Sequence, residues 1–346
     1  MNALRTAFVV LALSVAVAAS GGQTLESPNS PPTANLAQLR QMIDHGHAAD
    51  ALRQLDALAA QQPVPAGVYR LRGVALYQRN SFQEADAAFA GALQQDPHDL
   101  ESTQMRGLTL FRLGQPAKAI PFLEAAHDWN AQTRVDPSYV LALCYVDTRN
   151  YDGARHAFAV QYGFAPDSAQ AYLLAARMLF RSEYLPIAKE YATKSLELDP
   201  QLPLAHELLG EIALAGEHLD VAIAEFEKER ARNPLEGSIY DRLGDAYVRA
   251  GDYTKAQQSL QRALLLEPGA TGPYILLGKA LLRSQDPVNA VMYLERAERM
   301  DPGNYMTHSL LGQAYRSLGR TADASREVDT AQKLQAASQP KLESVH

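Results

Sequence analysis

Apolar residues along most of this chain are spaced for pairs of short helices. Between residues 237 and 270, small and apolar residues first recur three or four positions apart, which places them on one face of a helix: Tyr240, Leu243, Gly244 and Tyr247. A second stripe of the same spacing follows after a Gly-Asp break: Ala256, Leu260, Ala263 and Leu264. Pro268 ends it, because proline lacks the N–H that continues a helix. This stretch predicts two helices joined by a tight turn.

The pattern then repeats along the chain. Alanine recurs at one phase, in steps of 34 residues except for one step of 35: Ala51, Ala85, Ala119, Ala154, Ala188, Ala222, Ala256, Ala290 and Ala324. Eight of the nine have a small residue twelve positions earlier, and seven have a proline twelve positions later. Because neither helix of a unit can bury its apolar stripe alone, the units are predicted to stack.

The repeated columns resemble the tetratricopeptide repeat. The residues that match its pattern in one unit are Leu243-Gly244, Tyr247, Gly251, Tyr253, Ala256, Ala263 and Pro268. The resemblance implies an all-α, right-handed α-solenoid of about nine stacked helix-turn-helix repeats, at residues 32–65, 66–99, 100–134, 135–168, 169–202, 203–236, 237–270, 271–304 and 305–338. It says little about the partner, because the family pattern consists of packing residues.

The first residues have the pattern of a secretory signal peptide. Residues 1–19 contain one basic residue, Arg5, then an uncharged apolar run and an A-x-A site at Ala16-Val17-Ala18. The run is shorter than the roughly 20 apolar residues that span a bilayer. We therefore expect a periplasmic or secreted protein without a membrane span after cleavage. Residues 20–31 are expected to form a flexible leader and residues 339–346 a C-terminal tail.

One unit is irregular. Residues 100–134 lack the terminal proline, contain one extra residue and carry Pro121 inside the second helix. Either a hinge toward the next unit or a tolerated insertion accounts for this. At the other end, the last predicted helix has one apolar stripe and is otherwise polar, as a terminal capping helix requires.

Composition and motifs narrow the function. The chain has 32 basic and 39 acidic residues, a net charge of −7, which argues against nucleic-acid binding. The one cysteine, Cys144, excludes an intrachain disulfide and is expected to be buried. His45 and His47 lack a third ligand, so no metal site is expected. Without a phosphate loop, a zinc-protease motif or a nucleophile elbow, we expect neither enzyme activity nor a cofactor.

The family resemblance implies a concave groove lined by the first helices, with the second, fifth, ninth, twelfth and thirteenth positions of each unit pointing inward. The fifth, ninth and twelfth positions were followed residue by residue. In the second to fifth units many of these positions are apolar: Val74, Tyr77, Leu108, Phe111, Tyr139, Leu143, Val146, Leu173 and Phe180. An exposed apolar stretch of this extent is typical of a contact surface. Half-buried packing between helices is the alternative.

The sixth and seventh units are acidic at the same positions: Glu207, Glu211, Asp241 and Asp245. Like charges at this helical spacing repel one another weakly. Either they receive a basic partner segment, or a ladder of Arg177, Arg181, Arg249, Lys279 and Arg283 compensates them. The candidate partner-binding residues are Tyr77, Phe111, Tyr139, Leu143, Arg177, Phe180, Glu207, Glu211, Asp241 and Asp245.

The sequence therefore predicts a scaffold or adaptor of the bacterial cell envelope that binds a protein or peptide of basic and apolar character in its groove. An accessory subunit of an export or surface-polysaccharide machine, with glycan stacking on Tyr77, Phe111 and Tyr139, is one alternative. An enzyme without a recognisable signature is another. The oligomeric state is left open.

Overall fold

A computed structural model describes residues 36–126 and 136–338. In these ranges the chain is entirely helical apart from its turns and loops. The expected signal peptide, leader and tail lie outside the described residues, as does most of the junction that follows the irregular third unit.

Eighteen helices pack as consecutive pairs within the described ranges. The first helices of the pairs are α1 (Leu36–Asp44), α3 (Val68–Gln78), α5 (Leu100–Arg112), α7 (Pro137–Asp147), α9 (Ala169–Arg181), α11 (Ala205–Ala215), α13 (Gly237–Ala250), α15 (Thr271–Arg283) and α17 (Tyr305–Ser317). The second helices are α2 (Ala48–Ala59), α4 (Phe82–Gln95), α6 (Pro116–Ala125), α8 (Tyr151–Tyr162), α10 (Leu185–Leu198), α12 (Leu219–Arg232), α14 (Tyr253–Leu266), α16 (Pro287–Met300) and α18 (Thr321–Ser338). The predicted all-α stack of about nine helical repeats is confirmed.

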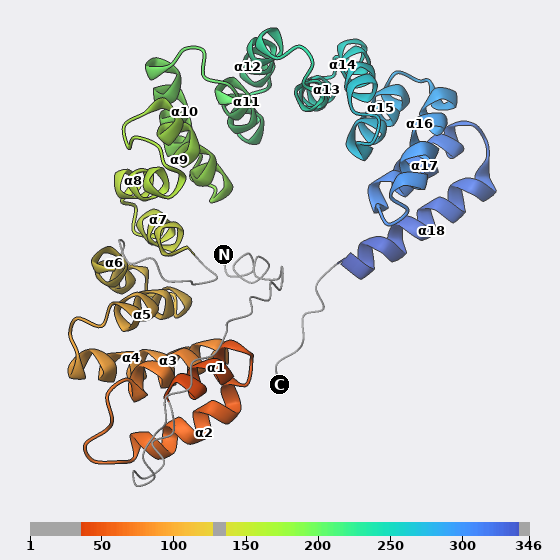
Figure 1. The fold of residues 1–346 in the computed structure, drawn as a ribbon. Coiled ribbons are helices and arrows are strands. Elements are labelled where there is room, and N and C mark those ends of the chain that lie inside the picture. The colour runs from red at the N-terminus through yellow and green to blue at the C-terminus, as the bar shows by residue number, and fades with distance from the viewer. Residues whose placement is uncertain (1–35, 127–135, 339–346) are drawn as a thin grey trace, which may run out of the picture.

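The repeats form an open arc (Figure 1). The odd-numbered helices from α5 to α15 lie on the inner side of the arc, and their even-numbered partners lie outside them. Each second helix also packs against the first helix of the next repeat, so the stack is continuous. The inner side is therefore a wall built from first helices, which is where the candidate binding residues were expected.

Small residues at the helix crossings explain the recurring glycine column. A Cβ atom added at Gly210 would lie 2.5 Å from the ring of Phe226, and one added at Gly278 would lie 2.5 Å from Leu294. Phe226 and Leu294 are fully buried, so neither has room to move away. The two helices of a repeat approach closely because the crossing residue has no side chain.

The repeats are also joined by a recurring polar contact. The hydroxyl of Tyr247 donates to Glu227 at 3.0 Å, and that of Tyr315 donates to Glu295 at 2.9 Å. In each case a tyrosine on the first helix of one repeat reaches the second helix of the repeat before it. This hydrogen bond ties neighbouring repeats together beside their apolar contacts.

Two local expectations concern the third and fourth repeats. Pro121 lies inside α6, which has only 10 residues compared with 14 in α4. The hinge hypothesis stays a prediction, because most of the junction lies outside the described residues. Cys144 is fully buried in α7, as expected for a small core residue.

The apolar core is divided along the stack. One cluster of buried side chains extends from Leu39 to Ile212, and a second extends from Ala213 to Ala324. The division falls within α11, the first helix of the sixth repeat.

Candidate binding surface on the concave face

The apolar positions predicted to line the groove differ in exposure. Val74, Leu108 and Val146 are 6%, 3% and 2% exposed, so they belong to the core and the packing alternative holds for them. The remaining apolar members of the candidate set are half-buried and lie against the core: Tyr77, Phe111, Tyr139, Leu143 and Phe180. These five keep part of their surface at the solvent boundary, so the structure narrows the apolar candidates to them.

Two of these aromatic rings are engaged by neighbours in the chain. Tyr77 lies edge-on to Phe82 with 5.4 Å between ring centroids, and Arg112 stacks over the other ring at 4.4 Å. Burial raises the pKa of Tyr77, although Arg112 opposes the change. Tyr139 lies against Phe158 at 5.9 Å. The rings are thus held in fixed orientations, which lowers the entropy lost when a partner contacts them.

The acids of the sixth repeat are bound by one arginine of the seventh. Nε of Arg242 lies 2.7 Å from Glu207, and its Nη2 lies 2.5 Å from Glu211. Glu207 is 6% exposed, so this is a largely desolvated contact. Burial raises the pKa of Glu211, and the neighbouring Glu207 adds to the effect, while Arg242, Arg177 and Arg181 oppose it. One guanidinium group thereby joins α11 to α13 across the division of the apolar core.

Asp241 is the acid of this set that lacks a cation in contact. Its Oδ1 is buried and accepts no hydrogen bond from the described residues. Burial raises the pKa of Asp241 to about 6; Arg242 opposes the shift, while Asp245 and Glu267 reinforce it. Its carboxylate lies beside the first turn of α15, where a Cβ at Gly272 would be 3.6 Å from Oδ2. Asp241 is consequently a carboxylate with unused acceptor capacity on the inner wall.

The predicted charge ladder is present only in part. Asp245 pairs with Arg249 at 3.1 Å within α13. Arg177 has a buried Nη2 that donates to none of the described residues. Lys279 and Arg283 form no ion pair with residues that the structure describes. Arg242 is not at the fifth or ninth position of its unit, yet it makes the principal contact with the acids, at Glu207 and Glu211.

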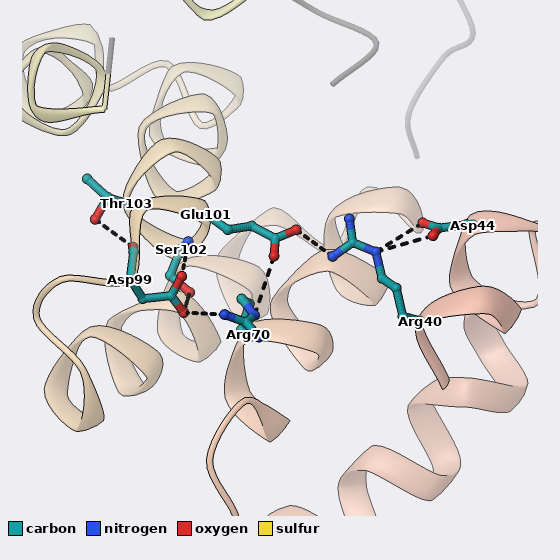
Figure 2. A network of polar contacts seen from close by, with 7 residues as sticks. All are labelled: Arg40, Asp44, Arg70, Asp99, Glu101, Ser102 and Thr103. Atoms are coloured by element: carbon teal, nitrogen blue, oxygen red, sulfur yellow. Dashed lines mark hydrogen bonds and ion pairs between the residues drawn. The ribbon is translucent and has the colours of Figure 1, made fainter. Parts of the chain in front are cut away.

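A second ion-paired cluster lies on the first three repeats (Figure 2). Arg40 of α1 and Arg70 of α3 both point at Glu101 of α5, at 2.5 and 3.4 Å. Arg40 also pairs with Asp44 at 3.2 Å. Arg40 and Arg70 occupy groove positions of their repeats, and Glu101 occupies the second, another groove position, whose residues were not followed through the units. The contacts bind three successive first helices together.

The same cluster includes the start of α5. Asp99 is the N-cap of this helix and accepts from the Ser102 backbone N–H at 3.2 Å, which satisfies one free N–H of the first turn. Arg70 Nη1 lies 3.3 Å from the other carboxylate oxygen of Asp99, as Figure 2 shows. A helix cap and a cross-repeat ion pair therefore share one side chain. Of the half-buried aromatic residues, Tyr77 and Phe111 share α3 and α5 with this cluster, and Tyr139 and Phe180 lie on the helices between it and α11.

Models of the tetratricopeptide repeat match residues 40–100, 242–305 and 281–344. The chain is a tetratricopeptide repeat protein. A model described as subunit 3 of the anaphase-promoting complex, or cyclosome, matches residues 78–161. As a tetratricopeptide repeat protein, the chain is a protein–protein interaction scaffold of a family that is typically non-enzymatic.

Among curated proteins, this tetratricopeptide repeat protein is similar to "Superkiller complex protein 3" of Mus musculus, with 23% identity over 239 residues. The match covers 66% of this chain and only 15% of that relative. No described helix is both long and apolar enough to cross a membrane.

Several solved structures are similar to parts of the chain. YrrB, "a TPR protein with an unusual peptide-binding site", is 24% identical, with 54% of this chain and 95% of that chain covered and a TM-score of 0.46. MamA of Desulfovibrio magneticus RS-1 is 18% identical, with 50% and 98% covered and a TM-score of 0.47. The Cut9–Hcn1 assembly is 18% identical, with 81% and 55% covered and a TM-score of 0.44.

Proposed function

We propose that this scaffold is an exported adaptor of the bacterial cell envelope that holds a protein or peptide segment against its concave wall. The signal-peptide pattern of residues 1–19 supports export. The open arc of first helices supports the site, because it offers one continuous inner surface to an extended segment (Figure 1). Binding without chemical change is the function that follows.

The observation that carries the proposal is the half-buried apolar middle of the wall. Phe111, Tyr139, Leu143 and Phe180 come from three successive first helices, α5, α7 and α9, and all four lie on the core with part of their surface open. Aromatic side chains held in place in this way are typical anchors of protein interfaces. Burial of their remaining surface supplies the affinity, and the flanking charges orient the partner.

The contacts refine the expected partner chemistry. Glu207 and Glu211 are already bound to Arg242, so a basic partner does not need to neutralise them. Asp241 retains an acceptor oxygen without a donor. A partner segment with apolar side chains and one donor group, such as a lysine ammonium or a hydroxyl, fits this arrangement. The partner therefore needs only one donor or positively charged group, which would contact Asp241.

A peptide-display selection on the mature protein tests the binding mode. The dissociation constant of a selected peptide is then measured for the wild type, for Phe111→Ala and for Val288→Ser. Val288 is 66% exposed on the outer helix α16 and serves as the control. We expect at least tenfold weaker binding for Phe111→Ala alone. Equal affinity of all three helical proteins would exclude this part of the wall as the site.

Export is tested separately. The protein is expressed in a bacterium, the periplasmic fraction is isolated and the mass of the intact chain is determined. We expect a chain that lacks the apolar segment through Ala18. A full-length chain confined to the cytoplasm would contradict the envelope location and leave the binding proposal standing.

The polysaccharide alternative is less well supported by the ring contacts. Sugar stacking requires an open aromatic face, whereas Tyr77 and Tyr139 contact Phe82 and Phe158 in edge or tilted arrangements. A glycan array probed with the same protein compares the two functions directly. Saturable glycan binding that Phe111→Ala abolishes would favour an accessory subunit of a polysaccharide machine.

A further inference from the structure

Three potential ligands from three consecutive helices meet at the C-terminal end of the stack. Glu298 belongs to α16, His308 to α17 and Glu327 to α18. One ligand atom from each lies within 4.8 Å of the other two. His308 and Glu327 are 4% and 5% exposed, so the cluster is inside the protein rather than on a solvated face.

The histidine ring is held in a defined orientation. Its Nε2 lies 3.0 Å from the carbonyl oxygen of Pro302, which can only accept, so Nε2 carries a proton. Its Nδ1 lies 2.7 Å from Oε2 of Glu327. Two lone pairs face each other at this distance unless a positive charge lies between them, either a proton or a metal ion. An imidazole oriented by a backbone carbonyl is the usual arrangement around a bound metal.

The surrounding charges leave the cluster negative. Glu298 makes no ion pair or hydrogen bond with another residue that the structure describes. The second oxygen of Glu327 lies 3.3 Å from Nε of Arg326, whose side chain is 62% exposed. Two carboxylates are thus balanced by one solvated guanidinium, which leaves an excess negative charge beside Nδ1. This charge favours a cation in the cluster.

An earlier repeat contains a matched pair without the third ligand. His206 and Glu225 occupy the same positions exactly 102 residues earlier, with Nδ1 and Oε2 2.5 Å apart. At the position that corresponds to Glu298 this repeat has Leu196. Glu225 is also bound by Lys228 at 2.7 Å. The histidine–glutamate pair therefore recurs as a packing element, whereas the extra carboxylate, from α16 of the eighth repeat, is found only beside the later pair.

The carbonyl that orients the ring differs in the same way. His308 donates to the carbonyl of Pro302. The corresponding carbonyl near His206 is that of Pro200, and it accepts from Arg232 at 2.6 Å instead. Thus both the third carboxylate and the carbonyl-held imidazole distinguish the cluster at Glu298, His308 and Glu327.

We propose that Glu298, His308 and Glu327 form a binding site for a divalent transition-metal ion, with Zn²⁺ as the best fit. Imidazole and carboxylate ligands suit zinc, and three protein ligands leave one position for water. Zinc bonds of about 2.0–2.2 Å place tetrahedral ligand atoms roughly 3.3 Å apart. Nδ1 of His308 and Oε2 of Glu327, which lie 2.7 Å apart, must therefore separate by about 0.6 Å. The Glu298 oxygen must approach by up to about 1.5 Å, which rotation of its half-buried side chain supplies. The ion would join α18, the terminal capping helix, to α16 and α17.

A proton competes for the same place. Burial lowers the pKa of His308, but the hydrogen bonds to Glu327 and to the Pro302 carbonyl outweigh it and raise the pKa overall. Zinc must displace this proton, so its affinity depends on pH. The motif search did not indicate the cluster, because its members are 10 and 19 residues apart and match no metal-binding spacing.

Isothermal titration of the tag-free full chain with ZnCl₂ at pH 7.5 tests the site. We expect one equivalent to bind to the wild type, and Glu298→Gln to weaken that binding at least tenfold. Glu298 has no partner to lose, so this variant should retain the fold. The control replaces His45 and His47 with glutamine. These exposed histidines lie in the turn between α1 and α2, so the change should leave zinc binding unchanged.

Thermal unfolding supplies a second readout. Zn²⁺ should raise the unfolding temperature of the wild type and not that of Glu298→Gln, while CaCl₂ should affect neither, because calcium prefers oxygen ligands alone. Equal zinc affinity of wild type and Glu298→Gln would show adventitious binding and overturn the proposal. A wild type that binds no zinc would show that the cluster holds a proton only.

Discussion

Arg242 of the seventh repeat donates to the buried carboxylate of Glu207 in the sixth repeat at 2.7 Å. The contact spans α11 and α13, so an ion pair joins two neighbouring inner helices. The second nitrogen of the same guanidinium reaches Glu211. One arginine side chain therefore binds two acids of the preceding repeat.

Removing this side chain should destabilise the protein. We expect Arg242→Ala to lower the free energy of unfolding by about 1–3 kcal/mol, because Glu207 is then a buried carboxylate without its cation. Urea denaturation followed by circular dichroism measures the change. Arg249→Ala is the control, since its pair with Asp245 is more exposed and should contribute less than about 1 kcal/mol. Equal losses in both variants would contradict a special role for Arg242.

A methyl group should destabilise the protein at a helix crossing and have little effect in a loop. At Gly278 a Cβ would lie 2.5 Å from Leu294, so we expect Gly278→Ala to cost about 1–3 kcal/mol despite the higher helix propensity of alanine. At Gly269 nothing lies within 4 Å of such an atom. Gly269→Ala should therefore change the unfolding midpoint little. Tolerance of both substitutions would mean that the crossing is looser than the structure shows.

The fold followed from the sequence because the packing residues recur in fixed columns. The fully buried Ala256 and the crossing glycine Gly278 belong to such columns, and each repeats the same contact in its own unit. When every repeat needs the same type of residue at one position, that residue type recurs in the sequence at a fixed spacing. Helix pairing and the order of the repeats could thus be predicted, while the inner location of the first helices was implied by the resemblance to the tetratricopeptide repeat.

Polar contacts between repeats could not be predicted from the recurring columns in this way. Arg242 reaches Glu207 across 35 residues, one repeat plus one position, so no single column contains the pair. The reach of an arginine side chain, rather than periodicity, decides which of several nearby cations makes the contact. The exposure of the apolar groove positions also depends on local packing, since Val74 is buried while Tyr77 in the same helix is half-buried.

Stability should depend on pH through Asp241. Burial raises its pKa from 3.8 to about 6, so between these values the folded protein binds a proton that the unfolded chain does not. Through this group, stability increases as pH falls from about 7 through 6 toward 4, and it is lowest above pH 7. The difference in unfolding free energy between wild type and Asp241→Asn, measured at pH 7.5 and 5.0, isolates this contribution from other titrating groups. We expect the asparagine variant to be the more stable protein at pH 7.5 and to lose that advantage at pH 5.0. The opposite order would show that Asp241 has a cation partner in solution.

The tyrosine contact between repeats should be measurable as a pairwise coupling. Tyr247→Phe removes only the hydroxyl that donates to Glu227 at 3.0 Å, and we expect it to cost about 0.5–1.5 kcal/mol of unfolding free energy. Lys255 lies over the ring at 5.4 Å, and phenylalanine preserves that contact. Tyr274→Phe is the control, since its hydroxyl reaches only the Pro268 carbonyl six residues away at 3.4 Å. In a double-mutant cycle, Glu227→Gln should have a smaller effect once Tyr247→Phe is present. Additive effects would mean that the two side chains do not interact, and the link between α12 and α13 would then rest on apolar packing alone.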